Sequence, residues 1–152
     1  MIPQTEFQQR RYDLMARLPE GSTVVIAAAT LLQKGNGTEA PFTQHSDFLY
    51  LTGFNEPNAW LVLSHLSAET SETGSNHKST LFCQPKDKLA EIWNGRRLGA
   101  EQAIETLLVD EAHSIDELEK ALPELLNGYK QVYFLLGTNE QQESVLMQAL
   151  QL

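Results

Sequence analysis

The feature that most constrains the fold is an uninterrupted apolar run over residues 24–29, Val-Val-Ile-Ala-Ala-Ala. A strand with one solvated face alternates apolar and polar residues, whereas a run without alternation is typical of a strand that is covered on both faces. Residues 22–29 are therefore predicted to form a buried strand. Residues 131–137, Gln-Val-Tyr-Phe-Leu-Leu-Gly, predict a second strand.

Helical patterns surround these strands. Apolar residues recur at three- and four-residue spacings from Phe7 to Leu18, and Thr5 with Gln8 is predicted to cap this first helix. Further helices are expected over 46–53, 86–93, 100–107, 115–126 and 141–152, strands over 59–63 and 80–83, and loops over 32–44 and 67–79. Strands that alternate with helices of these lengths predict an α/β sandwich around a central, mostly buried sheet.

The length of 152 residues favours a single domain that comprises residues 1–152. No stretch approaches the ~20 consecutive apolar residues needed to cross a bilayer, and the first residues lack the order of a secretory signal, so a cytoplasmic location is expected. The formal net charge of −9 argues against nucleic acid and anionic membranes as partners, because both are negatively charged. An acidic surface serves solubility, or a basic protein partner.

The usual catalytic constellations are missing from the sequence. It contains no His-Glu-x-x-His, no phosphate-binding glycine loop and no Gly-x-Ser-x-Gly. The four histidines are widely separated in the chain, which favours surface or satisfied polar roles over metal ligation. The single cysteine, Cys83, is expected to be an inert core residue. The acidic clusters 110–111 and 116–119 are interpreted as solvated faces. We therefore predict no catalytic and no metal-binding residue in this chain.

Two segments contain residues that helical or strand periodicity does not require. Residues 44–57 read Gln-His-Ser-Asp-Phe-Leu-Tyr-Leu-Thr-Gly-Phe-Asn-Glu-Pro, in which Ser46 or Asp47 is expected to cap a short helix that ends at Gly53. Residues 91–99 read Glu-Ile-Trp-Asn-Gly-Arg-Arg-Leu-Gly, which places a tryptophan and two arginines in a bend bounded by glycines.

At these two segments the sequence resembles the N-terminal domain of aminopeptidase P, the Xaa-Pro aminopeptidases, in the creatinase/prolidase N-terminal domain family. The pattern of that family is Ser-Asp-Phe-x-Tyr-Leu-Thr-Gly-Phe-Asn-Glu-Pro followed by Glu-Ile-Trp-x-Gly-Arg-Arg-Leu-Gly, and both runs are present. The resemblance extends over essentially the whole chain. Prolidase and creatinase relatives share the domain plan but usually diverge at these two runs.

The resemblance implies a three-layer α/β domain with a central mixed sheet and a ribonuclease-H-like motif. It also implies that a C-terminal "pita-bread" domain, absent from this chain, carries two manganese ions and removes an N-terminal residue that precedes proline. The chain alone is then inactive, and its partners are its own catalytic domain, neighbouring subunits of a homotetramer and Xaa-Pro peptides. The alternative is a non-enzymatic peptide- or histone-binding module related to the pita-bread proteins.

The resemblance further implies that Trp93 lines the active-site entrance of a neighbouring subunit, with Arg96 and Arg97 as supporting residues. The family often has an acidic residue in the loop before Pro41, where Gly37 stands here. The residues themselves also allow a structural interpretation, in which Trp93 stabilises a bend and the two arginines are surface cations.

Overall fold

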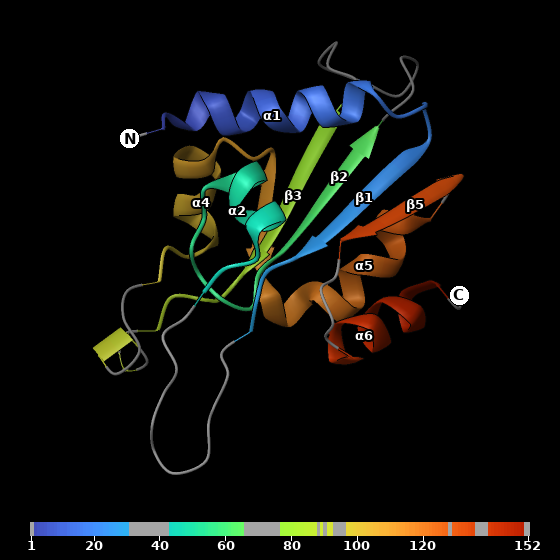
Figure 1. Cartoon of the computed structure of the whole chain (residues 1–152). Helices are drawn as coiled ribbons and strands as arrows, with labels where there is room; N and C mark the ends of the chain where they lie inside the picture. Colours follow the sequence, from blue (N-terminus) through green and yellow to red (C-terminus); the bar gives the residue numbers. More distant parts are fainter. Residues whose placement is uncertain are drawn as a thin grey trace.

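The computed structural model describes residues 2–30, 43–65, 77–87, 89, 91–92, 97–127, 129–135 and 140–150. Its centre is a five-stranded sheet with the order β4-β3-β2-β1-β5 (Figure 1). The strands are β1 (Ser22–Ala27), β2 (Trp60–His65), β3 (His77–Cys83), β4 (Glu111–Ser114) and β5 (Gln131–Leu135). The pairs β1–β2 and β2–β3 are antiparallel, whereas β1–β5 and β3–β4 are parallel, so the sheet is mixed.

Helices cover the sheet from two sides (Figure 1). On one side are α1 (Gln4–Ala16), α2 (Ser46–Thr52) and α4 (Ala100–Leu107), and on the other are the short 3-10 helix η1 (Ile115–Glu117), α5 (Leu118–Leu126) and α6 (Glu140–Leu150). The predicted α/β architecture with a central mixed sheet is therefore confirmed. None of the helices in the described ranges is both long and apolar enough to span a membrane.

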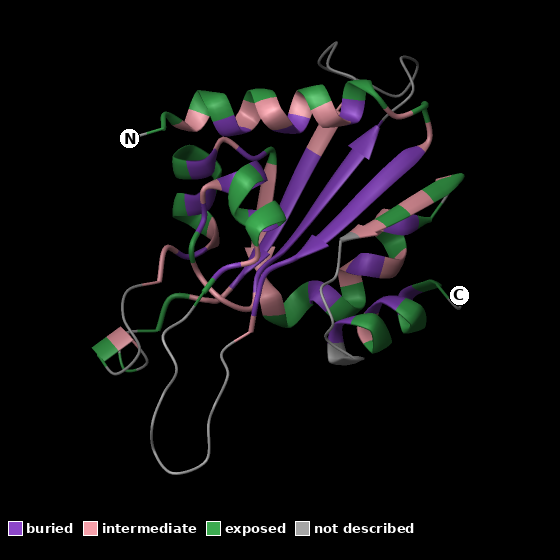
Figure 2. Ribbon diagram, viewed as in Figure 1, coloured by how far each residue is buried: buried purple, intermediate pink, exposed green. Residues whose placement is uncertain are grey.

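Strand β1 explains the apolar run from which the fold was predicted. Val24 and Ile26 belong to the core beneath α1, α2 and α4, whereas Val25 and Ala27 belong to the core beneath α5 and α6. All six residues of β1 are buried, as are those of β2 (Figure 2). Apolar side chains are needed on both faces of such a strand, which removes the alternation of a half-exposed strand.

Both predicted helix N-caps are wrong. Helix α1 begins at Gln4 after Pro3, so Thr5 lies inside its first turn, and no side chain caps the helix. Helix α2 has His45 at its N-cap position, also without a side-chain hydrogen bond, because Ser46 and Asp47 already lie within the helix. The predicted glycine end of α2 is confirmed, since Gly53 has a φ of 66°.

Strand β4 was not expected from the sequence. Its four residues, Glu-Ala-His-Ser, are neither β-branched nor strongly apolar, and all are only half-buried because β4 is an edge strand. The prediction of a helix over 115–126 is confirmed in the form of η1 followed by α5, which accommodates Pro123 without a break. The predicted loop over 32–44 lies outside the described residues except for its last two, and that over 67–79 except for residues 77–79, which belong to β3.

Candidate functional site

The two motif segments meet at one end of the sheet. In the first, Gly53 ends α2 and is followed by a stretch without helix or strand that contains Glu56. In the second, Leu98 and Gly99 immediately precede α4. The Glu56 Oε2 atom accepts a hydrogen bond of 2.8 Å from the backbone N–H of Leu98. A carboxylate from one motif thus binds the backbone of the other.

Gln44 fixes the backbone around Glu56. Its side chain is 8% exposed, and its Oε1 atom accepts hydrogen bonds from the N–H groups of Ala29 at 2.8 Å and His45 at 3.0 Å. Its Nε2 atom donates to the carbonyls of Phe54 at 3.2 Å and Glu56 at 2.9 Å. A buried amide that satisfies four backbone groups holds the first motif to the end of β1.

Four charged or polar contacts join the beginning, the middle and the end of the segment from Pro85 to Leu98. The Glu91 Oε1 atom accepts from the N–H of Arg97 at 2.8 Å and lies 3.7 Å from the Lys86 Nζ atom. Lys86 Nζ donates to the Arg97 carbonyl at 3.2 Å, and Arg97 Nη1 donates to the Pro85 carbonyl at 3.2 Å. The Lys86 side chain therefore binds the backbone of Arg97, and the Arg97 side chain binds the backbone of Pro85, next to Lys86.

A cavity of about 730 Å³ lies beside these contacts. Its lining includes two carboxylates and two cations, Glu56, Glu101, Lys86 and Arg97, together with apolar surface from Pro85 and Leu98. Among the described residues nothing hydrogen-bonds to the Glu56 Oε1 atom, which is shut off from solvent. Burial raises the pKa of Glu56 above its ordinary value, although the Leu98 N–H and Arg97 both act to lower this pKa.

We expect Glu56→Gln to raise the melting temperature at neutral pH. Because the pKa of Glu56 is raised in the folded chain, its contribution to stability is full below the ordinary pKa of glutamate and is lost as the pH rises through the raised value. Glutamine keeps the acceptor for Leu98 without the buried charge. Melting curves from about pH 4 to about pH 8 should show an advantage of the variant that grows with pH. A variant less stable than the wild type at neutral pH would mean that the anion is well compensated.

Leu89 and Ile92 are the most exposed large hydrophobic residues in the described part of the chain, at 73% and 72%. They lie three residues apart in a helical turn that Asp87 begins, since Asp87 Oδ1 accepts from the Leu89 N–H at 3.0 Å. Glu91 is half-buried and points to Arg97. Glu91 thus faces the protein while the side chains of Leu89 and Ile92 face solvent, and exposed large apolar side chains are typical of a contact surface.

Of the predicted site residues, Arg97 lies at the cavity described above. It is half-buried and hydrogen-bonded to the Pro85 carbonyl, rather than a free surface cation. Trp93, Arg96 and Gly37 lie outside the described residues. Sequence reasoning did not single out Gln44, Glu56 or Glu91. The local sequence does not distinguish these side chains from solvated ones, because the fold decides which groups they bind.

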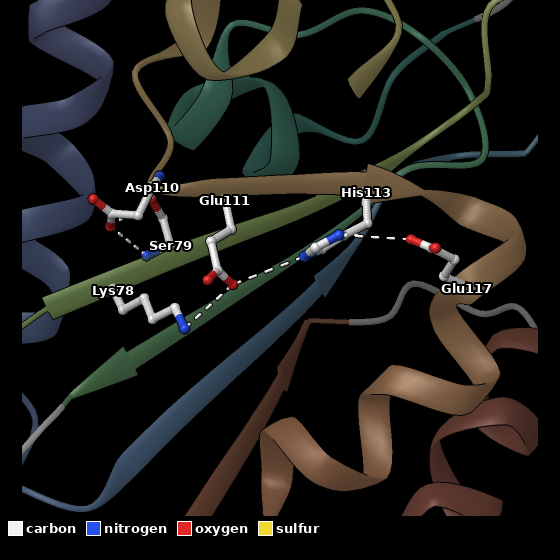
Figure 3. Close-up of polar contacts among 6 residues, drawn as sticks. All are labelled: Lys78, Ser79, Asp110, Glu111, His113 and Glu117. Atoms are coloured by element: carbon white, nitrogen blue, oxygen red, sulfur yellow. Dashed lines mark hydrogen bonds and ion pairs between the residues drawn. The ribbon is translucent and has the colours of Figure 1, made fainter. Parts of the chain in front are cut away.

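A second set of polar contacts joins β3 to β4 and to the residue before it (Figure 3). Asp110 Oδ2 accepts from the N–H of Ser79 at 2.8 Å and from its hydroxyl at 3.2 Å, so the interpretation of Asp110 as a solvated carboxylate is wrong. Glu111 Oε2 lies 3.2 Å from Lys78 Nζ and 3.8 Å from His113 Nε2. These contacts secure the edge strand, whose own side chains are only half-buried.

The histidines are not all isolated in space. His65 and His77 are paired across β2 and β3, their ring centroids are 5.0 Å apart, and the ring of Tyr12 stacks on His77. Burial, together with His65, lowers the pKa of His77. The expected core position of Cys83 is confirmed, and burial raises the pKa of its thiol to about 11. No group of three or more His, Cys, Asp or Glu side chains within the described ranges is arranged to hold a metal ion.

Comparisons with known proteins agree with the motif resemblance. The family model for the aminopeptidase P N-terminal domain matches residues 7–133. The chain is 41% identical to the Xaa-Pro aminopeptidase of Escherichia coli over 150 residues, which cover 99% of this chain and 33% of that protein. It is also 41% identical to the Haemophilus influenzae Xaa-Pro aminopeptidase over 132 residues, which cover 87% of this chain and 29% of that protein.

Solved structures show the same likeness. The low-pH form of E. coli aminopeptidase P matches with a TM-score of 0.88 and 41% identity, over 99% of this chain and 33% of the E. coli chain. This chain therefore spans about one third of the length of the relatives it matches. The two motif segments, the fold and the family match lead to one conclusion: the chain belongs to the family of aminopeptidase P N-terminal domains.

Proposed function

We propose that this chain is the non-catalytic N-terminal domain of a proline-specific metalloaminopeptidase, which removes an N-terminal residue that precedes proline. The observation that carries the proposal is the 41% identity over nearly the whole chain to an Xaa-Pro aminopeptidase three times as long. The domain assists oligomer assembly, and Trp93 lines the active-site entrance of a neighbouring subunit.

The location of chemistry and cofactors follows from the same proposal. In such an enzyme the two manganese ions would be bound by a C-terminal domain. No catalytic step is assigned to residues of this chain. The proposed partners are that C-terminal domain, neighbouring subunits of a homotetramer and Xaa-Pro peptides, in the cytoplasm.

The exposed turn beside Trp93 supports a role in contact with another subunit. Leu89 and Ile92 are 73% and 72% exposed, and they precede Trp93 by four residues and one residue. Two large apolar side chains on one face of a turn cost solvation free energy unless a partner covers them. The contacts of Arg97 with Glu91 and with the Pro85 carbonyl fix the shape of the segment that contains this turn.

A hybrid enzyme tests the role of the domain. In it, this chain replaces the matching third of the E. coli Xaa-Pro aminopeptidase. We expect the hybrid to assemble and to cleave Xaa-Pro peptides, and the same enzyme without an N-terminal domain to lose assembly or activity. A folded hybrid that neither assembles nor cleaves would favour the alternative, a peptide- or histone-binding module.

The hybrid also tests Trp93. We expect Trp93→Ala to lower kcat/KM for Xaa-Pro peptides about 10-fold, with normal metal content, because an indole at the entrance covers the apolar part of a bound peptide. In the isolated chain the loss of stability should stay below about 1 kcal/mol, whereas truncating a buried tryptophan costs about 3–5. Trp60, which is 4% exposed in β2, provides the control: Trp60→Phe should lower stability and leave kcat/KM unchanged. A severe loss of stability with unchanged kcat/KM would make Trp93 a core residue.

A further inference from the structure

The segment from Pro85 to Leu98 leaves and rejoins the domain at one place, and its rejoining end is held by two carboxylates on consecutive backbone amides. Glu91 accepts from the N–H of Arg97, and Glu56 accepts from the N–H of Leu98, both at 2.8 Å. These two bonds therefore fix the backbone direction at residues 97 and 98.

The two carboxylates have different origins. Glu91 belongs to the segment itself, so its bond to Arg97 shapes the segment but does not attach it to the domain. Glu56 lies 42 residues away from Leu98 in the sequence. Its backbone is held by Gln44, which also accepts from the N–H of Ala29 directly beyond β1. A series of hydrogen bonds thus leads from Ala29, just past the end of β1, through Gln44 and Glu56 to Leu98.

The burial of the Glu56 carboxyl group has an electrostatic cost. Its Oε1 atom is buried and accepts no hydrogen bond among the described residues, and burial raises the pKa of the carboxyl group. A residue that contributed only packing would be replaced at little cost by an apolar side chain. What the carboxyl group contributes is the hydrogen bond that holds the backbone N–H of Leu98 in place.

We propose that Glu56 is a positioning residue, which acts through the Leu98 N–H to fix where the segment 86–97 rejoins the domain and thereby sets how effectively that segment contributes to substrate handling. The effect on substrate handling rests on the proposed function. The local effect on the segment does not.

Two substitutions separate the reach of the side chain from its charge. Glu56→Gln keeps an oxygen at the same distance from the backbone and removes the charge, whereas Glu56→Asp keeps the charge and withdraws the oxygen by about one bond length, roughly 1.5 Å. If the position of the oxygen matters, the backbone at Leu98 is held in Glu56→Gln as in the wild type and is released in Glu56→Asp. Glu101→Ala is the matched control, since Glu101 lines the same cavity but lies within α4.

The first measurement is amide hydrogen exchange of the 152-residue chain, with circular dichroism to establish that each variant is folded. We expect Glu56→Asp to speed the exchange of the Arg97 and Leu98 amides about 10-fold or more, and Glu56→Gln and Glu101→Ala to leave it nearly unchanged. In 5-fluorotryptophan-labelled protein, Glu56→Asp should shift the ¹⁹F resonance of Trp93, assigned with Trp93→Phe, and not that of Trp60. Unchanged exchange and an unchanged Trp93 resonance in Glu56→Asp would overturn the proposal.

The second measurement is kcat/KM of the hybrid enzyme for an Xaa-Pro peptide. We expect Glu56→Asp to lower kcat/KM about 5-fold or more, and Glu56→Gln to restore most of it. If Trp93→Ala lowers kcat/KM and Glu56→Asp does not, the positioning role is overturned. If neither substitution changes kcat/KM while exchange still responds to Glu56→Asp, the tie to Leu98 stands, and the proposed role of the domain at the substrate entrance fails.

Discussion

Replacing Arg11 with methionine is expected to lower the free energy of unfolding by roughly 3 kcal/mol, one of the two largest effects that we predict for this chain. Arg11 is 2% exposed, and its guanidinium donates to the carbonyls of Leu51 at 2.8 Å, Leu107 at 2.9 Å and Leu108 at 3.0 Å. Leu51 and Leu107 lie in the last turns of α2 and α4, and Leu108 is the C-cap residue of α4. Carbonyl groups at the C-terminal end of a helix have no partner within the helix. Methionine fills the space but leaves the carbonyls buried and unpaired.

Arg10 provides a matched control on the same helix. Its side chain is 20% exposed; it contacts Glu6 at 3.3 Å, donates to the Tyr50 carbonyl at 3.0 Å and lies 4.3 Å from the centroid of the Tyr50 ring. We expect Arg10→Met to cost about 1 kcal/mol or less, because water can replace these contacts. Urea melts of both variants decide the matter. Equal losses would show that the buried guanidinium contributes no more than a surface one.

Arg11 shows what sequence reasoning could and could not predict. The spacing of Phe7 and Met15 is eight residues, which places position 11 on the same helix face, and the structure buries all three residues. The helical pattern therefore carried the signal for a buried arginine. Its partners could not be predicted, because they lie 40 and 96 or more residues away and depend on where α2 and α4 end.

Among the strands, too, some could be predicted from the sequence and others could not. The apolar run of β1 predicted a strand covered on both faces because its composition reflects two separate cores. The edge strand β4 was missed, since its half-buried residues, Glu-Ala-His-Ser, depend on pairing with β3 rather than on their own apolar character. The polar contacts that hold it, from Asp110 to Ser79 and from Glu111 to Lys78, join residues more than 30 positions apart.

The candidate site was predicted in outline only. The two motif segments were identified from their residues, and the structure brings them together through Glu56 and Leu98. Gln44 and Glu56 were not singled out, because nothing local in the sequence tells a buried hydrogen-bonding glutamine or glutamate from a solvated one. Likewise, the separation of His65 and His77 in the chain concealed a cross-strand pair. Pairing across the sheet, not spacing along the chain, decides which polar residues meet.

Replacing Gly53 with alanine is expected to lower the free energy of unfolding by about 3 kcal/mol, through two separate causes. The φ of Gly53 is +66°, a conformation that costs a residue with a Cβ atom roughly 1 kcal/mol. A Cβ atom at this position would also lie 2.5 Å from the Cε2 atom and 2.7 Å from the Cζ atom of Phe7. The Phe7 ring is 8% exposed between α1 and α2, so it has little room to move.

Gly21 and Phe7 separate the two causes. Gly21 has a φ of +85°, and its nearest neighbour to an added Cβ would be the flexible side chain of Lys130 at 3.6 Å, so Gly21→Ala should cost only the backbone strain, about 1 kcal/mol. In a Phe7→Ala background the ring is gone, and the cost of Gly53→Ala should fall to the same value, which a double-mutant cycle from urea melts measures as a coupling of about 2 kcal/mol. Additive losses would show that the helix α1 shifts to accommodate the added methyl group. In that case the left-handed conformation alone, rather than close packing against Phe7, would require glycine at the end of α2.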